Sequence, residues 1–488
     1  MSTLGSRNLA APGNRTYCDQ SNFHHLAHQL EIPKCNKMLL KISKFLLYVS
    51  VFSVVVVLSS TFFPFIGGKD YFFRVSVELA LVFFALSWAF ENPEDVKSRL
   101  KKVASKPIFK AVSVFVLLVI LASLFAYDLH AAFWSNYERG EGGFQMIHYY
   151  IFFALLLALF TSDQDWSRLF KASLVAAVLM VLYGLFANLG WADNFIGPYS
   201  SGTAPASWWH KLVDGRFQGS LGNPAYAAPY LIFSMFYAFY LWAESRMSKL
   251  RRWIVYGGLT VAFLFFFTLS QTRGAFFGLG AAILAFLLYL IFRSCARVRK
   301  VSIIVLVCLV LLATPLFLFS NSPVVQKIPG SRMLDLSILS TDSFKTRLWT
   351  WGSAWGGFLE RPILGWGPEN FSTVFDKFFN PNHFVPGRQT ETWFDRAHSV
   401  YFDYLTETGI FGLLSYLAIF TVFFWQFFKH SSKTEDLKVS VKNALVFSLP
   451  VGYLVQGLVI FDVLPMYINL FLFFAFSQYF FSRYVKHE

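Results

Sequence analysis

Twelve hydrophobic stretches, each long enough to cross a membrane, constrain this chain more than any other feature. A helix needs about 20 apolar residues to span a bilayer. Only 14% of the residues are charged and 56% are hydrophobic, whereas about a quarter of a soluble domain is charged. The sequence therefore predicts an all-α polytopic membrane protein of about twelve transmembrane helices. The stretches lie near residues 45–65, 71–90, 109–127, 146–161, 172–190, 222–243, 253–271, 274–292, 300–319, 408–428, 443–462 and 466–482.

Lysine and arginine are unevenly distributed between the two sides of the predicted bundle. If the N-terminus lies inside, inside segments hold 28 of the 42 basic residues, short outer segments hold 6 and the long outer loop holds 8. Basic residues favour the cytoplasmic side of short loops. This distribution predicts cytoplasmic N- and C-termini. It also accounts for the formal net charge of +14, so nucleic-acid binding is not expected.

The hydrophobic stretches divide the chain into four parts. Residues 1–37 form a polar cytoplasmic extension without the apolar core of a signal peptide. Met38 directly precedes the first hydrophobic stretch, so the start of translation at Met1 is in question. Residues 38–319 hold the first nine predicted helices, and residues 320–407 form one large outer loop. Residues 408–488 hold the last three helices and a short cytoplasmic tail.

The large loop contains an apolar stripe at helical spacing. Leu348, Trp351, Trp355 and Phe358 recur within the segment Phe344–Glu360, which predicts a helix with one apolar face. Tryptophans on such a face suit the boundary between water and lipid. Packing of the same face against the bundle is an equal alternative, and either arrangement keeps this helix at the membrane surface.

His398 is the strongest candidate for acid–base chemistry, because it lies where a polar loop turns into a hydrophobic helix. Histidine titrates near neutral pH and can accept a proton from a hydroxyl group. Either Asp395 or Asp403 is a candidate to orient its ring. The alternative for an isolated histidine at the start of a helix is a structural role.

Two arginines at membrane borders are candidate anion ligands. Arg273 lies in the short border Gln271–Gly274 between two hydrophobic stretches, where burial of an unpaired guanidinium is costly. A guanidinium offers fixed, bidentate donors to phosphate. Arg216 lies between Gly215 and Gly219, which permit close approach of a ligand to the backbone. The alternatives are a snorkelling arginine at position 273 and an ordinary loop arginine at position 216.

Two further arginines are candidate substrate contacts. Arg139 lies in the first sizeable outer loop, where Glu141 is close enough in sequence to form a solvated ion pair with it. Arg396 lies two positions before His398 and can face elsewhere.

Metal, nucleotide and disulfide chemistry have little support in the sequence. The Asp163-Gln164-Asp165 triplet falls in a predicted cytoplasmic loop, and no close His/Cys cluster occurs outside. No phosphate-binding GxxxxGK[ST] loop is present. No disulfide framework is expected, because no cysteine lies in a predicted outer segment. The four cysteines are Cys18, Cys35, Cys295 and Cys308.

Several of these segments together resemble the O-antigen ligase and polymerase family, the WaaL-like and Wzy-like bacterial membrane glycosyltransferases. The resemblance covers most of residues 45–482. It implies a GT-C-like fold of twelve helices with a large periplasmic loop, in the bacterial inner membrane. The similar stretches are NYERGEGGFQMIHYYIFF, GRFQGSLGNP, SQTRGAFFGL, KTRLWTWGSAWGGFLERPILGWGPENF and, most specifically, FDRAHSVYFDYLTETGIFGLLSYL.

The resemblance also assigns roles to individual residues. Arg216 and Arg273 match the family arginines taken to hold a diphosphate, and His398 matches the histidine taken to activate an acceptor hydroxyl. Arg347 matches a recurrent arginine of the loop helix, which implies a role in substrate binding. Ser399 stands where many relatives have asparagine, which puts one local hydrogen bond in doubt.

The activity implied is transfer of a glycan from undecaprenyl diphosphate to an acceptor hydroxyl, without metal, nucleotide or another cofactor. Attack opposite the leaving group would invert the anomeric centre. The implied partners are the lipid-linked donor, membrane lipids and an acceptor. A lipid A core sugar (ligase) ranks first, followed by a second repeat unit (polymerase) and a protein hydroxyl (O-oligosaccharyltransferase).

A lipid-linked glycan flippase or transporter is the alternative from a different class. Transport usually requires ionisable residues at mid-membrane depth. The predicted helices carry few charges, and Glu78 is the clearest exception. Arg74, one turn earlier, is the expected partner of Glu78. Movement of labelled lipid in vesicles without sugar transfer would favour this class.

Overall fold

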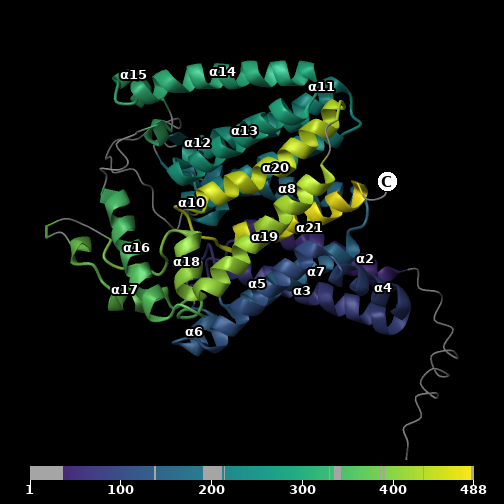
Figure 1. Ribbon diagram of the computed structural model, residues 1–488, viewed down its shortest axis with the longest axis horizontal. Helices are drawn as coiled ribbons and strands as arrows, with labels where there is room; N and C mark the ends of the chain where they lie inside the picture. The colour runs from purple at the N-terminus through teal and green to yellow at the C-terminus, as the bar shows by residue number, and fades with distance from the viewer. Residues whose placement is uncertain are drawn as a thin grey trace, which may run out of the picture.

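In the computed structural model, every regular element of the described residues is helical (Figure 1). The structure describes residues 37–136, 139–190, 212–213, 215–328, 330–334, 342–384, 386–387, 391–431 and 434–484. Nearly all of the predicted N-terminal extension, residues 1–36, lies outside the described part, as do Cys18 and Cys35. The prediction of an all-α polytopic membrane protein is confirmed.

Each of the twelve predicted hydrophobic stretches corresponds to a helix. Nine helical segments among the described residues are long and apolar enough to span a membrane, and the apolar Gly143–Leu159 helix is shorter. The helices are α2 (Met38–Ser50, continued by η1, Val51–Val55), α3 (Gly67–Leu86), α5 (Pro107–Leu124), α7 (Gly143–Leu159), α8 (Asp163–Asn188), α10 (Pro224–Glu244), α12 (Gly258–Ser270), α13 (Arg273–Arg293), α14 (Ala296–Leu318), α19 (Gly409–His430), α20 (Leu437–Gln456) and α21 (Leu464–Tyr484).

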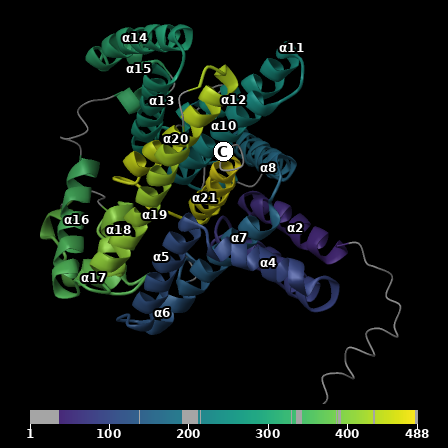
Figure 2. The same ribbon diagram turned by 45° about the vertical axis from the view of Figure 1, so that its right-hand side comes forward.

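The helices differ strongly in how far the protein covers them. In α21, 89% of the most apolar window is buried, whereas in α14 only 6% is buried. Both views place α21 inside the bundle and α14 at its edge (Figures 1 and 2). Aromatic rings fill the space around α21: Phe471 stacks on Tyr149, and Phe476 meets Tyr240 edge to face. The exposed apolar side chains of α14 suit contact with lipid.

Helices α13 and α20 approach each other closely through two glycines. A methyl group at Gly452 would lie 2.6 Å from the carbonyl oxygen of Gly278, and one at Gly278 would lie 2.8 Å from the carbonyl oxygen of Gly452. Small residues at such a crossing let two helix backbones pack directly. Because α13 begins at Arg273, this crossing also fixes the position of that arginine.

The large loop folds over one end of the bundle as α16 (Asp342–Glu360), α17 (Phe371–Lys377) and α18 (Val400–Glu407), at the left in Figure 1. Both alternatives for the predicted apolar stripe are partly realised. Trp351 packs inward, stacks on Phe402 and donates its indole N–H to the Ala397 carbonyl at 3.0 Å. Leu348 and Trp355 are exposed, at 47% and 49%.

The expected pairing of Arg74 with Glu78 is wrong. Glu78 instead pairs with His148 at 2.8 Å, and Arg74 donates to the side chain of Gln145 and to the Gly140 carbonyl. The reason is the packing of α3 against α7, which brings closer partners to both side chains than the next turn of their own helix does.

Candidate active site

A cavity of about 580 Å³ opens at the end of the bundle that the large loop covers. Its walls come from eight separate parts of the chain. They are residues 63–66, residue 139, residues 216–226 up to the start of α10, the turn between α12 and α13, residue 332, the start of α16, the segment before α18, and the connector between α20 and α21. Five of the six site residues predicted from the sequence line it together, and Arg396 does not. The five are Arg139, Arg216, Arg273, Arg347 and His398.

The ring of His398 is held in one orientation. Its Nδ1–H donates to the carbonyl oxygen of Arg396 at 3.2 Å, so Nε2 is the basic nitrogen. Phe394 and Phe461 meet the imidazole edge to face on two sides, with ring centroids 5.3 and 5.1 Å away. His398 also has a left-handed backbone, with φ of 57°, a conformation that non-glycine residues adopt mainly where the fold enforces it.

The prediction of an orienting carboxylate is wrong, since the described structure shows a hydrogen bond from His398 to a backbone carbonyl and none to Asp395 or Asp403. Asp395 is occupied by Arg139, and Asp403 accepts the Ala397 N–H at 2.7 Å. Burial, and then the charge of Arg347, lower the pKa of His398 from 6.5 to about 4. The imidazole is therefore neutral at pH 7 and able to accept a proton.

The connector between α20 and α21 fixes the position of His398. The Val400 N–H, at the start of α18, donates to the carbonyls of Gly457 and Ile460 at 2.9 and 3.1 Å. The next residue of the connector, Phe461, contacts the imidazole. The connector also borders α13, because a methyl group at Gly274 would meet Val459 at 2.6 Å. It thus joins the histidine to the arginine-bearing turn.

Arg139 belongs to a network on the other side of Phe461. Its guanidinium bonds both carboxylate oxygens of Asp395, at 2.5 and 3.0 Å, and the Tyr226 hydroxyl at 2.6 Å. The same guanidinium lies over the Phe461 ring, 5.2 Å from its centroid. The expected pair with Glu141 is wrong, because Glu141 accepts a hydrogen bond from Tyr149 instead. Although burial raises the pKa of Asp395, Arg139 holds it below the usual value.

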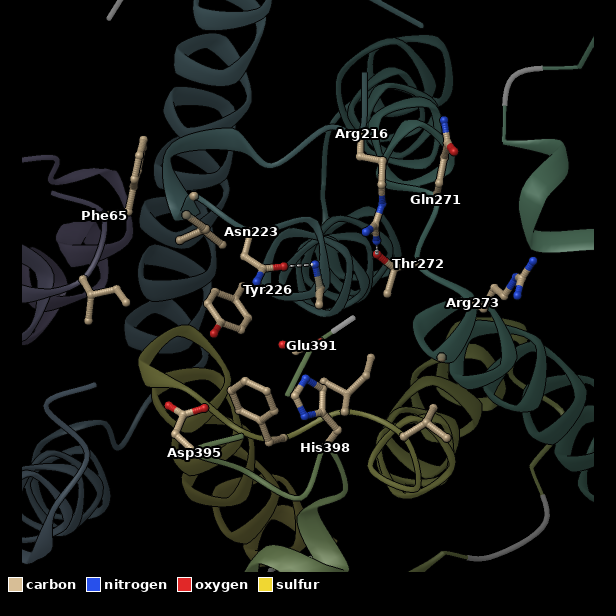
Figure 3. A pocket seen from close by; sticks show the side chains of 18 of the residues that line it. Phe65, Arg216, Asn223, Tyr226, Gln271, Thr272, Arg273, Glu391, Asp395 and His398 are labelled. Carbon is tan, nitrogen blue, oxygen red and sulfur yellow. Dashed lines mark hydrogen bonds between the residues drawn. The ribbon is translucent and has the colours of Figure 1, made fainter. Parts of the chain in front are cut away.

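Arg216 and Arg273 both lie at the turn between α12 and α13. Arg216 donates to the Ser270 carbonyl at 3.1 Å and to the Thr272 hydroxyl at 3.3 Å. Arg273 donates to the carbonyl of Arg332 at 2.9 Å. Figure 3 shows Arg216 extending from the side opposite His398, and Arg273 pointing away from His398. The two guanidinium groups therefore differ in direction, with that of Arg273 turned away from the imidazole.

The cavity carries an excess of positive charge. Among the described lining residues, five are arginines and two, Glu391 and Asp395, are acidic. Burial lowers the pKa of Arg347, although Glu391 opposes that shift. Guanidinium groups that are partly desolvated and close to one another favour a bound anion. A phosphate or diphosphate group is the ligand whose charge fits this cavity.

Arg396 is buried outside the cavity, at 5% exposure. It forms ion pairs with Glu369 and, at 2.8 Å, with Glu407. Glu407 is the last residue of α18, and Glu369 lies between α16 and α17, so the side chain of Arg396 points into the protein. The prediction of substrate contact does not agree with this position; only its carbonyl, which accepts from His398, reaches the site.

Sequence reasoning missed several lining residues. Tyr226, Arg332 and Glu391 face the cavity, and the segment Phe63–Ile66 forms an apolar wall. Only the last of these had a local signal, an aromatic and proline cluster at a membrane border. No group of three or more His, Cys, Asp or Glu residues with metal-binding geometry occurs in the described part of the chain.

Comparison with known proteins adds one match to this geometry. Residues 258–417 match the family model described as O-Antigen ligase. This match supports assignment of the chain to the O-antigen ligase and polymerase family. The O-antigen ligase match extends from α12 into α19 and includes Arg273, Arg347 and His398. Arg139 and Arg216 lie outside the matched residues but in the same cavity. The comparison with curated proteins gave no match.

The O-antigen ligase family assignment agrees with the resemblance seen in the sequence. It supports, at the level of the family, a multi-pass membrane enzyme of the glycosyltransferase type that uses a lipid-linked glycan.

Proposed function

We propose that this protein transfers a glycan from undecaprenyl diphosphate to an acceptor hydroxyl, with inversion and at the periplasmic face of a bacterial inner membrane. The observation that carries the proposal is the shared cavity of a neutral imidazole and five arginines. The distribution of lysine and arginine supports the orientation. The family match supports activity of the O-antigen ligase and polymerase type. Within that type, our proposal is a ligase with a lipid A core sugar as acceptor.

The proposed reaction breaks one bond to phosphate and forms one glycosidic bond. The Nε2 atom of His398 accepts the proton of the acceptor hydroxyl, and the oxygen attacks the anomeric carbon. The bond from that carbon to the diphosphate oxygen breaks, and undecaprenyl diphosphate leaves with the bonding electron pair. Arg216 and Arg273 stabilise the charge that grows on the leaving group. The imidazolium then loses its proton to water.

The first test concerns the two arginines. Arg216→Ala and Arg273→Ala are each expected to lower kcat by about 10²- to 10³-fold, the usual effect of removing one donor to a developing oxyanion. Transfer is measured in liposomes with a purified lipid-linked glycan and lipid A core acceptor. Lys345→Ala is the matched control, since this exposed lysine precedes Arg347 by two residues and does not line the cavity.

Full transfer by either arginine variant would remove that residue from the proposed mechanism. Loss of transfer in the Lys345→Ala control as well would indicate a diffuse effect of charge. Glycan movement without transfer, in vesicles that lack acceptor, would support the flippase alternative instead.

A second prediction concerns pH. The pKa of His398 in the protein alone is about 4, and a bound diphosphate adds negative charge that favours the imidazolium and raises this pKa. The fall of kcat/KM at low pH reports the pKa of the base in the free enzyme. The fall of kcat at low pH reports the pKa of the base in the enzyme–substrate complex. We therefore expect kcat to fall at a higher pH than kcat/KM as the pH is lowered. Coincident declines of kcat and kcat/KM, measured from about pH 3 to about pH 8 so that the range includes the pKa of the free enzyme, would contradict the assignment of His398 as base.

A further inference from the structure

A second large cavity lies at the opposite end of the bundle. Helices α19 and α21 begin beside the candidate active site and end at this second cavity, whose volume is about 930 Å³. The C-terminal end of α4 (Pro93–Ala104), the N-terminal end of α5, the C-terminal end of α7 and the start of α8 complete its wall. In Figure 1 these helix ends lie on the right, away from α16 to α18. Nothing in the proposed transfer reaction uses this cavity.

The charged residues that line this second cavity are all basic among the described residues. Among the described residues that line it, five are basic and none is acidic: Lys102, Lys106, Lys429, His430 and Arg483. Of these five, only Arg483 forms an ion pair with an acidic residue of the described part of the chain, Asp163 at 2.8 Å. Burial, and then the charge of Lys102, lower the pKa of Lys106. An anion between these side chains would relieve that repulsion.

The surroundings of the cavity match the surface of a membrane. Trp425 is 56% exposed at its rim, and the ammonium group of Lys429 lies over its indole ring, 5.4 Å from the centroid. Exposed tryptophan beside lysine is typical of the water–lipid boundary. The first residue of α5, Pro107, also lines the cavity, so the positive end of this helix dipole adds to the field.

We propose that this cavity binds the phosphate headgroup of an anionic phospholipid. Basic pockets between transmembrane helices on the cytoplasmic side are suited to such headgroups, and the predicted orientation puts this end of the bundle there. Lys102, Lys106 and Lys429 contact the phosphate, and Trp425 lies at the level of the glycerol backbone. This inference is independent of the proposed transfer activity.

The experiment measures binding of phosphatidylglycerol to the purified full-length protein in detergent, by native mass spectrometry and by thermal stabilisation. Lys102→Gln, Lys106→Gln and Lys429→Gln are combined in one variant. Each lysine near an anionic lipid surface is expected to contribute about fivefold to the affinity. The triple variant is therefore expected to bind about 100-fold more weakly. The matched control combines Lys97→Gln, Lys101→Gln and Lys110→Gln, three exposed lysines at the same end that do not line the cavity.

Retained binding in the control variant and loss in the lining variant would support the site. Equal loss in both variants would overturn it, because diffuse surface charge would then explain the binding. Equal stabilisation by phosphatidylcholine, or by free glycerol phosphate at the same concentration, would also overturn it. If the triple variant does not fold, Lys429→Gln alone, at an exposed position, is expected to weaken phosphatidylglycerol binding about fivefold, and unchanged binding would overturn the proposal.

Discussion

Replacement of His398 by asparagine is expected to lower the transfer rate by about 10²- to 10⁴-fold, the usual contribution of a positioned general base. Asparagine is the sharper choice because His398 has a left-handed backbone, which asparagine adopts more readily than most residues. The local fold is therefore retained while the basic nitrogen is lost. Transfer is measured in liposomes, and donor KM is expected to change little, because the arginines remain.

Two further measurements separate a catalytic role of His398 from a structural one. The thermal unfolding temperature of His398→Asn is expected to stay close to that of the natural protein. In a His398→Gly variant, added imidazole is expected to restore part of the activity, since the cavity can admit the missing base. Full activity of His398→Asn, or its loss together with unfolding and without imidazole rescue, would remove His398 as the base.

Replacement of Arg396 is expected to have the second large effect, a loss of stability. Arg396→Ala is expected to lower the free energy of unfolding by about 3–5 kcal/mol, because it leaves Glu369 and Glu407 buried without their cation. Burial raises the pKa of Glu407 to about 8 even with Arg396 present. Without Arg396, both carboxyl groups are expected to become protonated. Unfolding is followed by tryptophan fluorescence during heating.

A surface ion pair gives the control for Arg396. Lys377 and Glu360 pair at 2.7 Å with side chains 49% and 40% exposed, so Lys377→Gln is expected to cost less than about 1 kcal/mol. The triple variant Arg396→Met, Glu369→Gln, Glu407→Gln is expected to recover much of the lost stability, since no unpaired charge remains. An Arg396→Ala protein of unchanged stability but without transfer would instead support the substrate contact predicted from sequence.

Local sequence patterns predicted the helices well because each spanning helix must satisfy its own backbone hydrogen bonds and present apolar side chains to lipid. The turn between α12 and α13 was predicted for the same reason, and Gln271 there adopts a left-handed conformation. Arg216, Arg273 and His398 could be joined in one hypothesis because each lies at a membrane border and matches a residue of the family that the chain resembles.

Partners that come from distant parts of the chain were not predictable. Arg139 and Asp395 are 256 residues apart, and Arg396 finds Glu369 and Glu407 on two other segments. In each case the sequence suggested the nearest residue of opposite charge, or no partner. Helix packing decides such pairs, because an arginine that leaves water takes the carboxylate that the fold brings within reach.

The direct backbone contact between α13 and α20 has a practical consequence for anyone who screens random variants. Arg273 lies five residues from Gly278, about 8 Å along the helix. Even alanine at Gly278 or Gly452 would force the two helices apart, and the displacement would carry the guanidinium of Arg273 with it. Inactive clones from such a screen will therefore map to the crossing of these two membrane helices as well as to the residues that line the cavity, and loss of function alone will not tell the two groups apart.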